Sequence, residues 1–461
     1  MGSMIRGRAL VLGAGTAGLL AARVLSDHFE LVTVVERDRL PDSPTHRPGV
    51  PQSQHLHGLL LRGKVILERY FPGLQSELAA DGAPYLDLML DLAAFTPRGW
   101  AVRFPSPLGG YSASRALLEW TVRKRVAALP NVAFLEETVI QGLVADDRRV
   151  VGARLAARGD AAAGDERCLR ADLVVDATGR GSHLARWLRE MGYPAPDETA
   201  IDPRLGYATR VYRIPDPPPG DWKGLFIQVI PHGPLRGGVL QPVEGERWMV
   251  TVGGAAGDYP PTDPDGFLEF TRTLASPTIY EAIRNAAPLS VVYGSRSTVN
   301  VLRHYERLAR FPEGLVALGD AVCAFDPIYG QGMTTAALGA EVLDDCLRRE
   351  RSRGNDSLRG LSRRFQARLA RSNRPAWDMA AGQDLRVPGV RTVGIRRRRP
   401  GPVAGVVGRY IARAAALSVE DVYARLTFNE VISLVRPPTA LFHPRMVTRV
   451  LFGPVGPNGV L

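Results

Sequence analysis

The stretch RALVLGAGTAGLLAARVL (residues 8–25), followed by LVTVVER (residues 31–37), decides the fold. It predicts a strand, a glycine-rich turn, a helix and a second strand, in the pattern G-x-G-x-x-G. Gly13 permits the tight turn, Gly15 lets backbone approach a pyrophosphate, and Gly18 lets the helix lie close to the sheet. Glu36 ends the second strand, where a carboxylate can accept a ribose hydroxyl. The stretch therefore predicts dinucleotide binding.

The composition predicts a globular enzyme. The chain has 461 residues, 45% of them hydrophobic, which is enough for two or three domains. Its three cysteines, Cys168, Cys323 and Cys346, have no metal-like spacing, and no apolar run or leader predicts a membrane span or secretion, so we expect a cytoplasmic protein. The net charge of +11 is spread along the chain and only Arg396–Arg399 forms a run, so we expect a solvated surface turn there and no nucleic-acid partner.

The spacing of apolar residues predicts the strands and helices of the rest of the chain. Residues 132–135, 139–144 and 150–156 predict a meander, and Ala171–Ala177 predicts a buried parallel strand. Short strands between about 200 and 298, with a strand pair ending at 290–300, predict a separate antiparallel sheet. The expected later helices are 331–349, 358–370, 377–385, 403–419 and 422–434, before a Pro/Gly-rich tail.

Two later stretches change the meaning of the first. Asp176-Ala-Thr-Gly179 ends the buried strand, and Gly319-Asp320 is followed by Pro327 and by Gly330-Gln-Gly332-Met333, which places a carboxylate at a strand end and amides at a helix start. With these three motifs in order, residues 5–385 resemble the class A flavoprotein monooxygenases of the p-hydroxybenzoate hydroxylase type. Segments 47–57, 114–120 and 296–300 are similar to bacterial polyketide-tailoring members, particularly polyether epoxidases.

The resemblance implies an architecture. The fold class is α/β, with an FAD-binding Rossmann-like domain of the glutathione-reductase type, an antiparallel-sheet substrate domain and a C-terminal helical region. The expected bounds are 4–76, 108–198 and 299–384 for the FAD domain, 77–107 and 199–298 for the substrate domain, and 385–461 for the helical region.

The resemblance also implies a reaction. FAD reduced by NADH or NADPH would react with O2, and the flavin C4a-hydroperoxide would epoxidise or hydroxylate a lipophilic polyketide-like metabolite in antibiotic biosynthesis. The cofactor would carry this chemistry, so no side chain is assigned as catalytic. The central motif reads Asp176-Ala-Thr-Gly179 where many members have a direct Asp-Gly pair, and this element is linked to nicotinamide use in the larger family.

The cofactor contacts are carried over by position. Glu36 and the glycine motif would hold the ADP half, Arg115 would reach the pyrophosphate or ribityl region, and Arg47 would sit by the flavin. Asp320 would accept a ribityl hydroxyl, and the amides after it would face the pyrimidine edge, where a helix N-terminus favours negative charge. The expected cofactor-binding residues are Gly13, Gly15, Gly18, Glu36, Arg37, Arg47, Arg115, Val139, Asp320, Pro327, Gly330, Gly332 and Met333.

Substrate contacts are expected on one face of the antiparallel sheet, which usually covers the active site in this family. Strand alternation lets Arg210 and Tyr212 share a face, and the sequence does not assign which face that is. The candidates are Arg210, Tyr212, Gln228, Gln241 and Arg296.

Other interpretations stay open. His55 and His57 lack a third ligand at metal spacing, so we expect packing beside the flavin or plain loop structure, and no metal. Asp320 can instead be a helix N-cap, and Glu36 can simply end a strand. Hydrolysis lacks its nucleophile elbow, and flavin-dependent halogenation lacks the W-x-W-x-I-P segment with its lysine. The alternative functions are a flavin reductase or an FAD-containing cyclase of the same fold, or a non-catalytic flavin-binding or interaction module.

Overall fold

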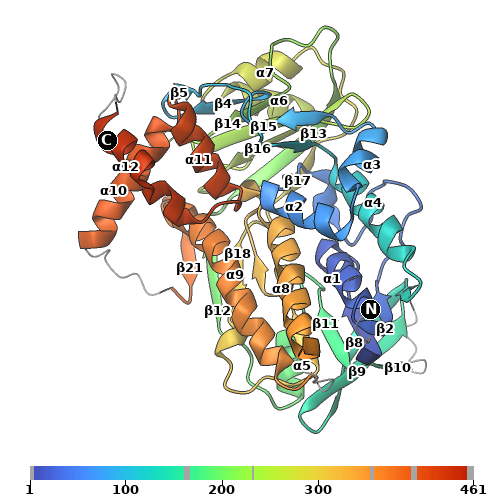
Figure 1. Cartoon of the computed structure of the whole chain (residues 1–461). Coiled ribbons are helices and arrows are strands. Elements are labelled where there is room, and N and C mark those ends of the chain that lie inside the picture. Colours follow the sequence, from blue (N-terminus) through green and yellow to red (C-terminus); the bar gives the residue numbers. More distant parts are fainter. Residues whose placement is uncertain (1–4, 160–166, 231–232, 353–357, 396–401, 454–461) are drawn as a thin grey trace.

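The computed structural model describes residues 5–159, 167–230, 233–352, 358–395 and 402–453 (Figure 1). Its centre is a five-stranded parallel sheet in the order β19-β11-β1-β2-β7. The inner strands are buried on both faces, which is why they are almost continuously apolar in sequence. The five strands are β1 (Ile5–Leu12), β2 (Phe29–Val35), β7 (Val132–Leu135), β11 (Leu173–Asp176) and β19 (Leu315–Ala317).

Three helices pack together beside this sheet. Helix α1 (Thr16–Ser26) connects β1 to β2, and α8 (Gly332–Ser352) lies between α1 and α9 (Leu361–Asp384). The expectation of two helices at 358–370 and 377–385 was wrong, because α9 continues through Pro375. Proline removes one hydrogen bond within the helix, but buried residues on both sides of it keep the two halves packed on the core. The other helices of this part are α2 (Leu61–Tyr70), α3 (Leu74–Ala80), α4 (Arg115–Ala127) and α5 (Leu184–Glu190).

Three smaller sheets surround the parallel one. The expected meander contains β8 (Thr138–Asp146), β9 (Arg149–Ala157) and β10 (Arg167–Arg170), whereas the segment 132–135 pairs in parallel with β2 instead. A second sheet has β20 (Cys323–Ala324), β18 (Asn300–Arg303), β12 (Glu198–Asp202) and β21 (Arg391–Val393), and a third has β3 (Tyr85–Asp87) and β6 (Gly109–Tyr111).

A seven-stranded sheet, mostly antiparallel, forms the part at the top of Figure 1. Its order is β17 (Tyr293–Ser295), β13 (Gly206–Arg213), β16 (Arg247–Gly254), β15 (Arg236–Val243), β14 (Gly224–Ile227), β4 (Leu92–Thr96) and β5 (Gly99–Trp100). The expected strand pair near 290–300 was wrong: β17 ends this sheet, and β18 belongs to another. Helices α6 (Pro264–Arg272) and α7 (Thr278–Ile283) cover one face of it through a shared apolar core.

The C-terminal region has a small core of its own, built from α10 (Pro402–Leu417), α11 (Val422–Ile432) and α12 (Pro444–Phe452). Helix α12 lies in the stretch expected to be a tail. Its first residue, Pro444, suits the first turn of a helix, and Met446 and Val450 share one buried face at helical spacing. The run Arg396–Arg399 lies outside the described residues. In the described part of the chain, no helix is long and apolar enough to cross a membrane. Short 3₁₀ turns are η1 (Pro51–Gln54), η2 (Tyr305–Arg307), η3 (Gly319–Ala321), η4 (Pro327–Tyr329) and η5 (Pro438–Phe442).

Candidate cofactor and substrate site

The three glycines of the first turn have different surroundings. Gly13 has φ +99°, and a Cβ there would lie 2.7 Å from the carbonyl oxygen of Ala177. A Cβ at Gly18 would lie 1.8 Å from the carbonyl oxygen of Gly13, so only glycine lets α1 pack this closely. A Cβ at Gly15 would meet no heavy atom within 4 Å, and no side chain caps the helix at this residue. Open space therefore lies in front of the α1 amides, which fits an ADP diphosphate.

Glu36 is buried, with 6% of its surface exposed, and belongs to the same turn. Its Oε2 accepts a hydrogen bond from the Ala14 amide at 2.9 Å, its Oε1 accepts one from the Asp38 amide at 3.1 Å, and Arg47 Nη1 lies 3.1 Å from Oε2. An ionised carboxylate has about four acceptor positions. Three are used here, so a ribose hydroxyl can be accepted without displacing a protein donor. Glu36 thus does more than end a strand.

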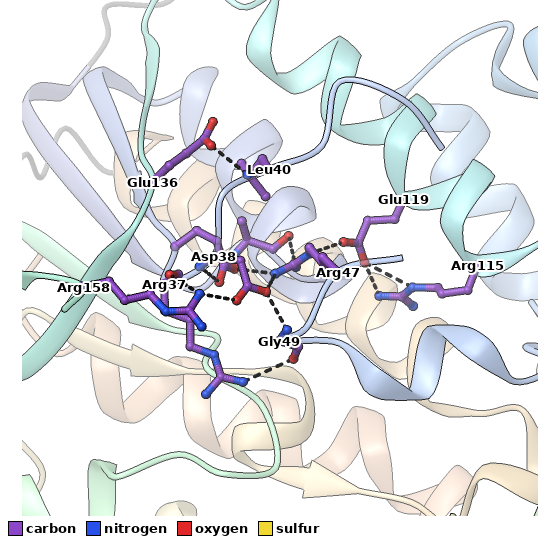
Figure 2. Close-up of polar contacts among 11 residues, drawn as sticks. Arg37, Asp38, Leu40, Arg47, Gly49, Arg115, Glu119, Glu136 and Arg158 are labelled. Atoms are coloured by element: carbon purple, nitrogen blue, oxygen red, sulfur yellow. Dashed lines mark hydrogen bonds and ion pairs between the residues drawn. The ribbon is translucent and has the colours of Figure 1, made fainter. Parts of the chain in front are cut away.

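Arg47 is the centre of a buried ion-pair network. Figure 2 shows it between Asp38 and Glu119, with Arg115 on the far side of Glu119. Its Nη1 lies 3.0 Å from Asp38 and its Nε 3.0 Å from Glu119, and Arg115 Nη2 lies 2.8 Å from Glu119. Burial raises the pKa of Glu119, but the charges of Arg115 and Arg47 outweigh it and hold the pKa below its usual range.

The position of Arg47 corrects one expectation. Arg47 was expected by the flavin, but its Nη2 donates to the carbonyl of Ala14 at 3.2 Å, at the nucleotide end of the site. The cause lies in the loop after β2: Asp38 accepts the Gly49 amide at 2.7 Å, which draws the segment carrying Arg47 back against Glu36.

Arg37 and Val139 lie at the outer end of β2. Arg37 is exposed and donates to the carbonyl of Gly49 at 3.3 Å (Figure 2). Val139 is half-buried on β8, next to Thr138, whose amide donates to the carbonyl of Glu36 at 2.9 Å. Both residues therefore lie beside the predicted ribose position, and their contact with a cofactor stays a prediction.

Asp320 lies at the other end of the site, in η3 after β19. Arg303 fixes this turn by donating to the carbonyls of Asp320 and Ala321 at 3.3 and 3.2 Å. The Asp320 carboxylate itself has no hydrogen-bond or ion-pair partner among the described residues, so the helix-cap interpretation was wrong. Burial raises its pKa, opposed by the charges of Arg180, Arg115 and Arg303. A half-buried carboxylate without a protein partner fits a hydroxyl-bearing ligand.

The turn after Asp320 leads into α8. Pro327 begins η4, Gly330 follows it with φ +61°, and α8 begins at Gly332. A Cβ at Gly332 would lie 3.7 Å from Asp320 Oδ1, which places the free carboxylate beside the first amides of the helix. Met333, by contrast, has its side chain in the apolar core, so only its amide can serve a ligand. These residues fit the ribityl and pyrimidine end of FAD.

The loop that contains His55 and His57, called the histidine loop below, connects this turn to the seven-stranded sheet. A Cβ at Gly58 would lie 4.0 Å from the Cα of Gly330. His57 Nδ1 hydrogen-bonds the carbonyl of His55 at 2.9 Å, and His55 Nδ1 lies 2.9 Å from the hydroxyl of Thr209 on β13. Burial lowers the pKa of both histidines to about 4, helped by the charge of Arg115 at His57 and of His46 at His55. Both rings are therefore neutral at pH 7.

Sequence reasoning missed a buried polar cluster behind the Asp320 turn. Asp384, at the end of α9, accepts the Tyr329 hydroxyl at 2.5 Å and the Asn300 side-chain amide, and Asn300 in turn accepts the amide of Asp326 at 2.7 Å. Burial raises the pKa of Asp384 to about 6. Its partners are 55 and 84 residues away in sequence, and no local pattern marks them.

Arg180 was missed as well, although it stands in the central motif. It donates to the carbonyl of Phe325 at 2.7 Å and to that of Val299. The motif's acid, Asp176, is fully buried and accepts hydrogen bonds from Thr178 and Ser182. Asp176 thus shapes its own loop, and Arg180 fixes the turn that carries Asp320.

A mainly apolar cavity lies next to the histidine loop. Gln241 of β15 is one of its polar lining groups, and its Nε2 donates to the Ser112 hydroxyl at 2.6 Å. The cavity therefore reaches the sheet on the face that also carries Thr209, the partner of His55. Its lining residues are His57, Leu59, Leu61, Lys64, Gln75, Leu78, Leu86, Leu88, Gly110, Tyr111, Ser112, Ala113, Leu118 and Gln241.

Four substrate candidates lie elsewhere. Arg210 and Tyr212 share a face, with the guanidinium 5.6 Å from the ring centre, but it is the face covered by α6 and α7. Strand alternation is the reason, since Thr209 takes the cavity side of β13. Arg296 is exposed and stacks on Tyr259 at 4.4 Å, and Gln228 is half-buried after β14. The expectation that Arg210 and Tyr212 face the substrate is therefore corrected. Arg296 and Gln228 are not among the residues that line the cavity.

No metal arrangement accompanies these groups. Within the described ranges, no three His, Cys, Asp or Glu side chains are placed to hold an ion together. Cys168, Cys323 and Cys346 are all free thiols.

The comparisons with known proteins agree with this geometry. No family model matches the chain. Protein Rv3254 of Mycobacterium tuberculosis is 36% identical over 389 residues, covering 82% of this chain and 80% of that protein. The chain belongs to its family. Kynurenine 3-monooxygenase of Salinispora tropica is 29% identical over 369 residues, covering 74% of this chain and 73% of that enzyme.

Solved structures of other proteins share the fold of this chain. The flavin-dependent brominase Bmp2 superposes with a TM-score of 0.65 at 14% identity, covering 93% of each chain. PqsL of Pseudomonas aeruginosa, described as a probable FAD-dependent monooxygenase, superposes with a TM-score of 0.61 at 18% identity, covering 83% of this chain and 97% of that one. The fold and the sequence relatives place the chain in the FAD-dependent monooxygenase superfamily, a class of oxidoreductases.

Proposed function

We propose that the chain is a monooxygenase that uses FAD, O2 and NADH or NADPH to epoxidise or hydroxylate a lipophilic, polyketide-like substrate. The observation that carries this proposal is the apolar cavity between the histidine loop and the seven-stranded sheet, next to the turn at Gly330. Leucines provide much of its lining, and the polar lining groups are His57, Lys64, Gln75, Tyr111, Ser112 and Gln241. Such a lining favours a lipophilic substrate oriented by a small number of hydrogen bonds.

The chain's own residues would bind and orient the cofactor. The α1 amides and Glu36 would hold its ADP half, and the free carboxylate of Asp320 would accept a ribityl hydroxyl. When bound, FAD supplies the activation of O2. The N-terminus of α8 would favour negative charge at the pyrimidine edge. His55 and His57 would lie between this edge and the seven-stranded sheet. Because both rings are neutral, they would add no charge there.

The decisive test is the source of the oxygen atom. Purified FAD-loaded protein is incubated with NADH or NADPH, an alkene-bearing polyketide probe and ¹⁸O2, and the product mass is measured. We expect one ¹⁸O atom per product molecule and consumption of reductant that depends on the probe. A matched reaction with ¹⁸O-labelled water should leave that atom unlabelled.

Other results would assign another function. A product formed without O2 or reductant would indicate a cyclase in which FAD is structural. Oxidation of NADH or NADPH without any oxygenated product would indicate a flavin reductase. Failure of both nicotinamides to reduce the bound flavin, together with no product, would favour a non-catalytic flavin-binding module.

A further inference from the structure

A lysine supplies the charge in the wall of the apolar cavity beside the histidine loop, called the substrate cavity below. Among the described residues that line this cavity, Lys64 is the one cation, and none is an aspartate or a glutamate. His57, the other basic lining residue, is neutral because burial lowers its pKa to about 4. A cleft whose walls are apolar and carry one sign of charge attracts ligands of the opposite sign. The lining therefore favours an anionic group in the ligand.

The ammonium group of Lys64 has no carboxylate partner. Its Nζ donates to the carbonyl of Gly109 on β6, and it makes no ion pair with any described residue. Glu68 stands four residues later on α2, at the spacing of a helical ion pair, but its oxygens accept the amides of Gly73 and Gln75 at 2.6 and 3.1 Å. Burial lowers the pKa of Lys64, and the charge of Glu68 opposes this effect only in part. An ammonium has three N–H donors, so Lys64 can serve a ligand without leaving Gly109.

Lys64 lies close to the proposed flavin site. A Cβ at Gly63, the residue before it, would lie 2.6 Å from Oγ1 of Thr334 in the first turn of α8. A Cβ at Gly110 would lie 3.0 Å from Lys64 Cδ and 3.2 Å from its Nζ, so this glycine leaves the room in which the lysine side chain lies along β6. A ligand group bound to Lys64 would thus lie near the helix that is proposed to face the pyrimidine edge of FAD.

Gln75 adds a neutral donor to the cavity wall. Its side-chain oxygen accepts the amide of Tyr111, the residue after Gly110, at 3.3 Å. Its side-chain NH2 group makes no hydrogen bond with the described residues, so it can donate to a ligand. The cavity thus combines one cation, an unused amide donor and an apolar surface. The leucines of that surface are Leu59, Leu61, Leu78, Leu86, Leu88 and Leu118.

The number of charges favours a carboxylate over a phosphate. A single ammonium balances the single negative charge of a carboxylate. A phosphate group carries about two negative charges at pH 7 and is commonly bound by several cations or by helix N-terminal amides. Lys64 is the one cation that the described lining offers. It is also half-buried, so solvent and salt weaken its pairing with an anion less than they weaken a surface ion pair.

We propose that Lys64 binds the carboxylate of a lipophilic acid whose apolar part lies against the leucines of the substrate cavity. This proposal rests on the proposed function and defines its substrate more closely, as an amphipathic monoanion. Lys64 thereby selects and positions the substrate, and the chemistry remains that of the cofactor.

Ligand binding without turnover tests this proposal. The FAD-loaded protein is titrated with octanoate and with octanamide, near neutral pH and without reductant, by isothermal titration calorimetry. The two probes have the same chain and planar heads of similar size, so they differ mainly in charge. We expect octanoate to bind the wild-type protein at least about tenfold more tightly than octanamide, the difference that one charged contact provides. Lys64→Met should reduce this preference to about twofold or less, and Lys64→Arg should keep part of it because the charge remains.

A matched control separates a local contact from net charge. Lys124 on α4 is exposed, so Lys124→Met removes the same charge at another place. It should leave the preference for octanoate unchanged, and Lys64→Met should keep its FAD and a normal flavin spectrum. An equal loss of preference in Lys124→Met would overturn the proposal, as would a wild-type protein that binds both probes equally. Loss of FAD from Lys64→Met would also overturn it, because the lysine would then serve the cofactor or the fold.

Nuclear magnetic resonance of the wild-type protein gives a second readout. The chain has three lysines, Lys64, Lys124 and Lys223, so selective ¹³C labelling of lysine gives three sets of side-chain signals, and the set missing from Lys64→Arg belongs to Lys64. Bound octanoate should raise the pKa of Lys64, because a nearby negative charge favours the ammonium form, whereas octanamide should not raise it. An unchanged pKa of Lys64 at saturating octanoate would refute the contact.

The two proposals can fail separately, because these binding tests need neither O2 nor reductant. A preference for octanoate without oxygenation of any probe would contradict only the proposed function. Oxygenation without that preference would contradict only this inference.

Discussion

The substitution Gly15→Ala separates cofactor binding from folding. Gly15 has an extended conformation, with φ −74° and ψ −178°, which any residue adopts, and its new Cβ would meet nothing within 4 Å. Replacing glycine by alanine stabilises by about 0.4–1 kcal/mol through the unfolded chain, while alanine is a poorer helix N-cap by a similar amount. The apoprotein should therefore keep its stability to within about 1 kcal/mol.

The affinity for FAD should fall in the same variant. The methyl group would occupy the space in front of the α1 amides, where the diphosphate is expected. Loss of one charge-assisted hydrogen bond costs about 1.5–3 kcal/mol, which raises the dissociation constant about 10- to 150-fold. The assay is a titration of apoprotein with FAD, followed by flavin fluorescence, next to urea unfolding of the apoprotein.

Gly18→Ala provides the contrast. Its Cβ would lie 1.8 Å from the backbone oxygen of Gly13, so α1 must move, and overpacking of this kind costs about 1–3 kcal/mol or more. Gly18→Ala should thus lose stability without any ligand. If Gly15→Ala bound FAD with wild-type affinity, the diphosphate would not lie at this helix. If its apoprotein were destabilised as much as Gly18→Ala, the space around Gly15 would not be open.

Three further predictions address other parts of the site. Asp320→Ala should weaken FAD binding about 10- to 100-fold, and Asp320→Asn less, because an acceptor remains; full FAD occupancy and a normal flavin spectrum in the alanine protein would exclude the ribityl contact. Arg47→Met should cost about 3–5 kcal/mol in urea unfolding of the apoprotein, since its three buried carboxylate partners lose their cation; a loss below about 1 kcal/mol would contradict the network. The pKa of Asp384 is raised to about 6 in the folded chain, so the folded state keeps a proton that the unfolded chain releases, and stability should fall by about 2 kcal/mol between about pH 4.5 and 7; Asp384→Asn should lack this fall, and identical pH profiles would refute it.

The sequence predicted those parts of the fold in which local signals agree. β1, α1 and β2 combine apolar runs, glycines and helical spacing within 31 residues, and the structure confirms them. Predictions failed where tertiary contacts decide. Packing on both sides of Pro375 keeps α9 continuous, and pairing with β2 takes residues 132–135 out of the meander. Helix α12 was missed because the prolines and glycines on either side of it, such as Pro437, Pro438 and Gly453, resemble a tail.

The site was predictable in its motifs and not in its side-chain directions. Gly15 and Asp320 have the surroundings that their motifs indicate, open space and a free carboxylate. Arg210 and Tyr212 point away from the cavity because one step in strand register exchanges the two faces, and a single sequence does not fix that choice. The role of Asp384 could not be predicted from the sequence for another reason: its hydrogen-bond partners come from two distant segments.

The ion-pair network determines which groups can attract the diphosphate. Arg47 and Arg115 share Glu119, Arg47 also pairs with Glu36 and Asp38, and Arg158 pairs with Asp38 at 3.1 Å. Three arginines thus meet three carboxylates, and the network is balanced before any ligand binds. The attraction for the diphosphate must then come mainly from the α1 amides, whose dipole is fixed and lies at the open space before Gly15. Hence the glycine that keeps this space open, rather than any arginine near it, should dominate the affinity for FAD.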